Sequence, residues 1–423
     1  MMQTAPSPED RPRALRGRAL CPRVADMRVD LIPDALIEID STGRLTSVGP
    51  ALADCALAES FPGAVLLPGF VDAHIHFPQT RIIGSAGGPL LEWLERSVFP
   101  EESRFADRAY AAVVAGEFID ALIAQGTTSA AIFSSSHPGA TDELFMALDQ
   151  RGLRALSGLT LMDRGISGAP VLDASTALAA CDDLRRRWHR HDDGRLRVAM
   201  VPRFALSCSP ELLAAAGAMA RQHELFVHTH ISENQDEIRV TKDAFPGATD
   251  YLDVYERHGL VGERTLLAHA IWLSSDEWDR VARHGAAIAH CPDSNFFLGS
   301  GCMPLHEPLT RGCHVGLGTD VGAGRTFSMR RVASSAHDAS LITGIAGAPA
   351  SPESLLWLAT AGGARAIGLS GSVGHLLPGY EADIVAVDAP VGADTQALFD
   401  ALIFRHDAGP VRAAYVRGRR LQS

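Results

Sequence analysis

Lysine is almost absent from this chain of 423 residues: Lys242 is the only one, so arginine supplies nearly all of the positive charge. Acidic residues outnumber lysine and arginine together by 50 to 38, and the formal net charge is −12. A surface of that average sign repels phosphate backbones and anionic lipid headgroups. The composition therefore argues against nucleic-acid or membrane partners and favours a small-molecule partner.

Ordered cysteine patterns and long apolar runs are also missing. The seven cysteines are scattered and include no C-x-x-C pair, which argues against a disulfide framework and against a cysteine-based zinc knuckle. No apolar run approaches the roughly 20 residues of a membrane-spanning helix, and the N-terminal segment lacks the apolar core of a signal peptide. We therefore expect reduced, mostly buried cysteines in a cytoplasmic protein.

Neither a G-x-G-x-x-G motif nor a P-loop is present, which weakens the case for a doubly wound nucleotide-binding sheet. Between residues 69 and 370, helical patterns alternate with short apolar strands such as TTSAAIF and LFVHTH. This alternation, over about 300 residues, predicts an α/β fold with a (β/α)8 TIM-like barrel.

The two ends of the chain have a different texture. The runs DALIEID and RLTSVG are separated by the hairpin signal at residues 41–43, and GHLLPGYEADIVAVDA and VRAAYVRGRRL near the C-terminus are also β-rich. We therefore expect a small β-sandwich domain formed from both chain termini. The predicted division is 1–68 and 371–423 for this domain, with 69–370 for the barrel.

Polar residues at the ends of the predicted strands form a chemically coherent set. In a barrel, functional side chains lie at the C-terminal ends of the strands. The set comprises His74, His76, His230, His269, His290 and Asp320. Residues two apart on a strand point the same way, so an H-x-H pair can offer two ligands to one ion. Three imidazoles and a carboxylate suit zinc or ferrous iron, with one position left for water.

A single H-x-H is a weak signal, because His228 and His230 form a second one in the same chain. The metal prediction therefore depends on the convergence of several strand ends. Asp320 adds weight to it, since an acid behind the apolar strand of GLGTD is expensive to bury without a partner.

The motifs PGFVDAHIHFPQ, HISE, LLAHA, HCPDSN and GLGTDVGAG, in this order, resemble the amidohydrolase superfamily. With LLEWLERSVFPEE, MDRG and PRFALSCSPE added, the chain is similar over nearly its whole length to the guanine deaminase family within it. The resemblance implies one divalent metal ion, zinc before ferrous iron, and a homodimer. It assigns the metal to His74, His76, His230 and Asp320. Two-metal relatives bridge their ions with a carbamylated lysine on a barrel strand, and Lys242 lies in a predicted helix or loop instead.

The resemblance also implies a hydrolytic deamination of guanine to xanthine and ammonia. A divalent ion makes hydroxide available near neutral pH. Glu233, in H-x-x-E, is expected to shuttle protons between water and substrate, while His269 and Asp320 orient the water. We expect a structural or supporting role for His228 and a scaffolding role for His290.

Recognition of the purine base is implied for four residues. Gln79 can donate and accept hydrogen bonds at once, Arg203 offers a fork of donors, and Phe204 offers a face for stacking. The resemblance also implies that His230, one of the metal ligands, contacts the substrate. Without it, Arg203 and Phe204 would read as an ordinary ion pair and a core aromatic.

Two other functions stay open. The loop after Asp320 carries Arg325 where similar proteins have an uncharged stretch, so the substrate could be another aminoheterocycle: a pterin, 8-oxoguanine or a triazine. A catalytically silent amidohydrolase-like binding protein is the alternative from another class. Such proteins lose metal ligands, whereas here every expected ligand is present.

Overall fold

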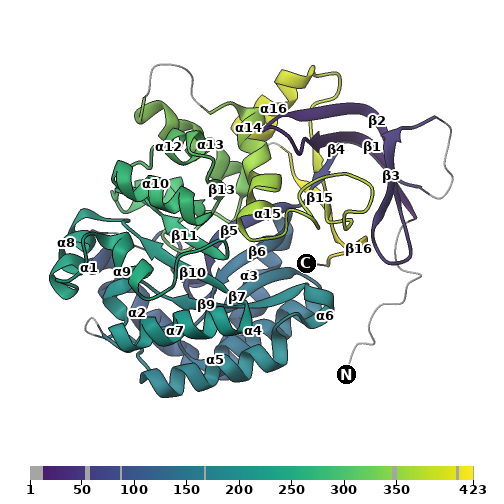
Figure 1. Cartoon of the computed structure of the whole chain (residues 1–423). Coiled ribbons are helices and arrows are strands. Elements are labelled where there is room, and N and C mark those ends of the chain that lie inside the picture. Colours follow the sequence, from purple (N-terminus) through teal and green to yellow (C-terminus); the bar gives the residue numbers. More distant parts are fainter. Residues whose placement is uncertain are drawn as a thin grey trace.

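Strands from both ends of the chain form one sheet beside a barrel that is built from the middle of the chain (Figure 1). The computed structural model describes residues 13–52, 58–85, 88–165, 168–344, 350–405 and 409–422. None of the helices in these ranges combines the length and the apolar character needed to cross a membrane. The six cysteines in these ranges are free, and four of them are buried; Cys55 lies outside the described residues.

The terminal sheet is mixed and has seven strands in the order β16-β15-β14-β4-β1-β2-β3. The strands are β1 (Ala14–Pro22), β2 (Val29–Ile39), β3 (Leu45–Pro50), β4 (Ala58–Pro68), β14 (Ile384–Asp388), β15 (Val411–Val416) and β16 (Arg419–Arg420). The predicted hairpin at residues 41–43 joins β2 to β3, which pair antiparallel. The predicted assembly of β-rich segments from both termini is thus confirmed, and where we expected a β-sandwich the structure has one mixed sheet of seven strands.

The barrel is an eight-stranded parallel array in the order β13-β12-β11-β10-β9-β7-β6-β5, to which β8 adds a short pairing with β9. Its strands are β5 (Phe70–His76), β6 (Thr127–Phe133), β7 (Arg154–Gly158), β8 (Thr160–Leu161), β9 (Leu196–Pro202), β10 (Phe226–Ile231), β11 (Thr265–His269), β12 (Ala287–His290) and β13 (His314–Leu317). Because these runs are buried on both faces, they read as continuous apolar stretches. The predicted barrel is confirmed.

Helices follow the strands and cover the barrel (Figure 1). They are α3 (Arg108–Ala124), α4 (Pro138–Arg151), α5 (Ala174–Trp188), α6 (His191–Gly194), α7 (Pro210–His223), α8 (Gln235–Ala244), α9 (Tyr251–Arg257), α10 (Ser275–His284), α11 (Pro292–Phe297), α12 (His306–Thr310), α13 (Met329–Ile342), α14 (Pro352–Trp357) and α15 (Gly363–Ala366). A further helix, α16 (Thr395–Phe404), lies between β14 and β15. We did not expect this helix, because the sequence near the C-terminus is typical of strands.

The first and last barrel strands meet through the loop that follows β13. The backbone N–H of Asp320 donates to the carbonyl of His74 at 2.8 Å, and that of His76 donates to the carbonyl of Val321 at 3.0 Å. A Cβ on Gly316 would stand 2.9 Å from the Cβ of Ala73, so only glycine permits this approach. The closure brings His74, His76 and Asp320 to one end of the barrel.

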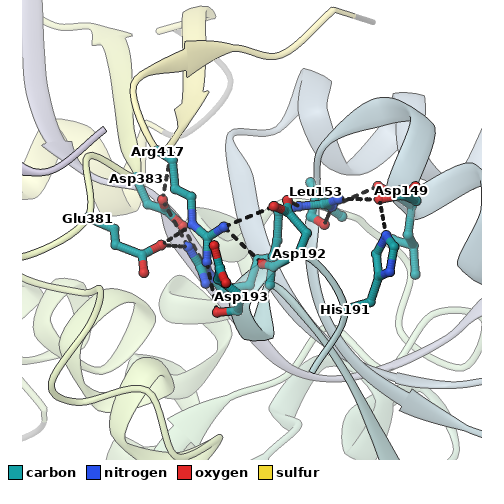
Figure 2. Close-up of polar contacts among 11 residues, drawn as sticks. Asp149, Leu153, His191, Asp192, Asp193, Glu381, Asp383 and Arg417 are labelled. Carbon is teal, nitrogen blue, oxygen red and sulfur yellow. Dashed lines mark hydrogen bonds and ion pairs between the residues drawn. The ribbon is translucent and has the colours of Figure 1, made fainter. Parts of the chain in front are cut away.

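A charged cluster fastens the terminal sheet to the barrel (Figure 2). Arg154, at the start of β7 and 2% exposed, donates to Asp383 at 2.9 Å and pairs with Glu381 at 2.5 Å. Arg417 from the sheet pairs with the same Glu381 at 2.6 Å and donates to the carbonyl of Asp192 at 2.9 Å. The arginines thus compensate two buried carboxylates that would otherwise be expensive to bury.

We expect Arg154→Met to lower the free energy of unfolding by about 3 kcal/mol, because buried Asp383 loses its ion pair with Arg154, while Glu381 keeps Arg417 and the half-exposed Arg44. The measurement is denaturant unfolding, with Arg186→Met as control. Arg186 is 62% exposed and pairs with Asp182, so its loss should change stability by about 0–1 kcal/mol. Equal stability losses in the two variants would contradict the role given to Arg154.

Candidate active site

Four of the predicted residues form a buried group that can hold a metal ion. His74 and His76 come from β5, His230 from β10, and Asp320 follows β13. One ligand atom from each lies within 4.8 Å of those of the others. The Oδ1 atom of Asp320 is 3.3 Å from Nε2 of His74 and 3.2 Å from Nε2 of His76. The strand ends therefore bring these four residues together, as expected for parallel strands of one barrel.

The chemistry of these atoms fits a divalent cation. Nε2 of His76 lies 3.2 Å from Nε2 of His230, so these two ring nitrogens face each other. Nε2 of His74 is buried without a hydrogen bond. Burial lowers the pKa of His74 to about 3 and that of His230 well below its ordinary value, which keeps both rings neutral. Neutral imidazoles and a carboxylate are the donor set that binds zinc or ferrous iron.

Neighbouring groups fix the rings of these histidines. Nδ1 of His230 lies 2.6 Å from the carbonyl of Arg203, and since a carbonyl only accepts, Nδ1 donates and Nε2 is left as an electron-pair donor. Nδ1 of His74 is 2.8 Å from Nε2 of His228, so one of these two ring nitrogens donates to the other. The supporting position expected for His228 is therefore the one it occupies, against the ring of His74.

The predicted shuttle, Glu233, lies beside the metal-ligating group on the loop after β10. Its Oε2 is 3.5 Å from Nε2 of His269, which in turn is 3.7 Å from Oδ2 of Asp320. Ser300 donates to the other oxygen of Glu233 at 3.3 Å, and Asn295 holds Nδ1 of His269 at 2.9 Å. Burial raises the pKa of Glu233 to about 7, a value suited to a group that must both take and give a proton at neutral pH.

Four residues of this site have strained backbone conformations. Ser232, His269, Ala270 and Asp320 all have φ between 48° and 71°, the left-handed region that side chains with a Cβ rarely adopt. Such conformations persist where surrounding structure imposes them, and they cluster at functional sites.

Two buried acids that the sequence did not single out support this arrangement. Asp72 accepts from the backbone N–H groups of His74 and Thr319, at 3.1 and 3.0 Å, and so ties β5 to the segment before Asp320. Glu237 accepts from the backbone N–H of Glu233 at 2.9 Å. A carboxylate two residues before His74 in an otherwise apolar strand was a signal for such a role, because an acid there needs partners.

A pocket opens beside the buried His-His-His-Asp group, and His76, His230 and Asp320 of that group line it. Its polar wall includes Gln79 and Arg203, and Phe204 contributes an aromatic face. The apolar residues around the pocket are Leu90, Trp93, Leu94, Leu298 and Ala323. Glu233 and His269 also line it. A cavity with one apolar wall and several convergent polar and ionisable groups suits a small polar ligand.

Three further residues that the sequence singled out, Arg325, His290 and Lys242, do not line this pocket. Arg325 donates to Asp293 through Nη2 at 2.7 Å and through its backbone N–H at 2.8 Å, and so anchors the loop after Asp320 to α11. His290 ends β12 and is buried, with no hydrogen-bond partner for either ring nitrogen among the described residues. Lys242 lies in α8, away from the barrel strands, as expected.

Comparisons with known proteins agree with this geometry. The profile of the Amidohydrolase family matches residues 65–421. A probable guanine deaminase of Deinococcus radiodurans is 42% identical over 371 residues, which cover 84% of each chain. The structure of E. coli guanine deaminase superposes with a TM-score of 0.92 at 33% identity, covering 97% of this chain and 99% of the other.

A second solved structure, guanine deaminase from C. acetobutylicum with guanine bound in its active site, gives a TM-score of 0.91 at 30% identity and covers 97% of this chain and all of the other. These matches extend over both the barrel and the terminal sheet. The chain belongs to the amidohydrolase family of hydrolases acting on C–N bonds, in which it groups with the guanine deaminases.

Proposed function

We propose that this protein deaminates guanine to xanthine and ammonia. The observation that carries the proposal is the position of a buried His-His-His-Asp group beside a pocket lined by Gln79, Arg203 and Phe204. Similar proteins carry the names probable guanine deaminase and guanine deaminase, and one of the latter was solved with guanine bound. The fold, the buried ligand set and the pocket all support the same reaction.

His74, His76, His230 and Asp320 would hold a divalent ion, which would lower the pKa of a bound water from 15.7 toward about 7. Glu233 would take one proton from this water and deliver it to the ring nitrogen beside the amino-bearing carbon, which would activate that carbon for addition of the water oxygen. Glu233 would then take the proton of the added hydroxyl and deliver it to the amino group, so that the C–N bond breaks as the carbonyl forms and ammonia leaves. His269, held by Asn295 and close to both Glu233 and Asp320, would orient the water.

The remaining pocket residues hold the base. Phe204, which is 4% exposed and lines the pocket, offers its face to the planar ring. Gln79 and Arg203 form hydrogen bonds with the donors and acceptors along the edge of the ring. His230 would serve both metal binding and substrate binding, because it belongs to the buried group of four residues and also lines the pocket.

We further propose zinc as the native ion, a homodimer as the assembly and the cytoplasm as the location. The neutral imidazoles support zinc, although ferrous iron takes the same ligands. The domain division at 68/69 and 370/371 is supported by the ends of β4 at Pro68 and of α15 at Ala366, between which the barrel is complete.

The test is a comparison of kcat/KM for guanine, a pterin, 8-oxoguanine and an aminotriazine, each followed by ammonia release. We expect guanine to exceed every other compound by at least about tenfold, because a site built for one set of ring donors and acceptors loses hydrogen bonds with the others. A higher kcat/KM for another aminoheterocycle would overturn the substrate while sparing the reaction. Absence of turnover with all four would favour the silent binding protein.

A further inference from the structure

A third buried acid, Glu102, connects the two polar residues of the pocket wall. Its side chain is 3% exposed. Oε2 accepts a hydrogen bond from Nη1 of Arg203 at 2.6 Å, and Oε1 accepts one from Nε2 of Gln79 at 3.2 Å. Gln79 and Arg203 come from segments more than a hundred residues apart, and one carboxylate holds both.

The helical segment that carries Glu102 also builds the apolar wall of the pocket. It runs through α1 (Leu90–Trp93), a π-helical turn η3 (Leu94–Val98) and α2 (Phe99–Ser103). Such π turns inside helices are frequent at functional sites. Leu90, Trp93 and Leu94 line the pocket, while the ring of Phe99 lies 5.4 Å from the guanidinium carbon of Arg203. Arg203 is therefore held between an aromatic ring and a carboxylate.

Glu102 fixes which way the amide of Gln79 points. A carboxylate only accepts hydrogen bonds, so the amide must turn its NH₂ group toward Glu102. At the other end, the backbone N–H of Gly322 donates to Oε1 of Gln79 at 3.1 Å, and an N–H can only donate. The two contacts demand the same orientation. One N–H and one lone pair of Gln79 remain for a ligand, in fixed positions.

Glu102 also sets the charge of the wall. Arg203 is 4% exposed, and its contact with Glu102 is a buried, charge-assisted ion pair. Because the ion pair as a whole is neutral, the guanidinium presents hydrogen-bond donors to the pocket without adding net positive charge to the pocket wall. A neutral wall suits an uncharged lactam ring and gives an anionic ring no compensating charge.

We propose that Glu102 is a positioning residue that fixes the donor and acceptor pattern of Gln79 and Arg203 and makes the pocket selective for uncharged purine bases over anionic ones. The proposal rests on the proposed function, in which Gln79 and Arg203 hold the base. It adds the residue that sets their orientation and the class of ligand that the wall rejects.

Glu102→Gln tests both parts, and Glu101→Gln is the matched control. Glu101 is the neighbouring buried acid on α2, but its carboxylate bonds to Tyr110 and Arg104 rather than to the pocket residues. With guanine, Glu102→Gln should raise KM about 10- to 100-fold with a smaller change in kcat, because a charge-assisted hydrogen bond to ligand-holding groups is lost. Glu101→Gln should leave both constants close to those of the wild type.

Calorimetric binding of two probes separates charge from packing. Hypoxanthine is uncharged at neutral pH, and urate is an anion. Glu102→Gln should shift the ratio of their affinities at least about tenfold toward urate, because the charge of Arg203 is no longer compensated. Glu102→Asp keeps the charge but shortens the reach, so it should raise the KM for guanine while leaving the ratio near the wild-type value.

Equal weakening of both probes in Glu102→Gln, or the same change in Glu101→Gln, would overturn the proposal, since that is the result of a merely structural role. A wild-type KM in Glu102→Gln would also overturn it. Failure of the wild type to turn over guanine would instead refute the proposed function, and the calorimetric ratio would still decide the role of Glu102.

Discussion

Glu233→Gln should bind metal as the wild type does and lose about 10³-fold or more in kcat. The amide has the shape of the carboxylate, but it cannot accept the two protons that the reaction must move, one from water to the ring nitrogen and one from the added hydroxyl to the leaving amine. Metal content should stay unchanged, because Glu233 is outside the buried group of four ligands. The measurements are metal analysis and steady-state turnover of guanine on the same preparation.

Glu211→Gln serves as the control for that variant, because Glu211 lies exposed in the first turn of α7. It should leave kcat unchanged. If Glu233→Gln kept wild-type turnover with full metal content, Glu233 could not be the shuttle. Asp320 and His269 would then be the candidates for moving the proton.

Asp320→Asn, unlike Glu233→Gln, should lose bound metal. Its loss of turnover should be equally large. Asp320 is the only anionic ligand of the group and lies 3.2 to 3.3 Å from two of its histidines. A neutral amide in its place removes the charge that favours a divalent ion among three neutral imidazoles. We expect the bound metal to fall from about one ion per chain to well below one, with kcat lowered about 10³-fold or more.

Titration of the Asp320→Asn protein with zinc separates loss of the ion from loss of the fold. The expected result is weaker binding in a protein that still unfolds cooperatively. Full metal occupancy together with wild-type turnover would exclude Asp320 as a ligand.

The strands, the barrel and the ligand group were predictable because each leaves a local pattern. The TTSAAIF run is strand β6 to the residue, and His74, His76, His230 and Asp320 all stand within three residues of a strand end. Once parallel strands are inferred, their carboxyl ends must lie together, so the convergence of these residues required no contact information.

The supporting partners were harder to predict because they depend on how the closed barrel brings distant segments together. Asp72 reaches Thr319 across 247 positions of the chain, His74 reaches His228 across 154, and Glu102 reaches Arg203 across 101. No spacing rule relates such pairs. Their one local signal is a polar residue in a buried, mostly apolar segment, which says that a partner exists but not which one.

The measurement that bears most directly on the proposed function is a mass balance on guanine, made with protein of known metal content. Purified protein is incubated with guanine, and ammonia and xanthine are followed together, before and after removal of the metal with a chelator. We expect the two products to appear in equal amounts, at a rate that scales with bound metal and disappears in the chelated sample. Metal-loaded protein that leaves guanine intact would contradict the proposed function.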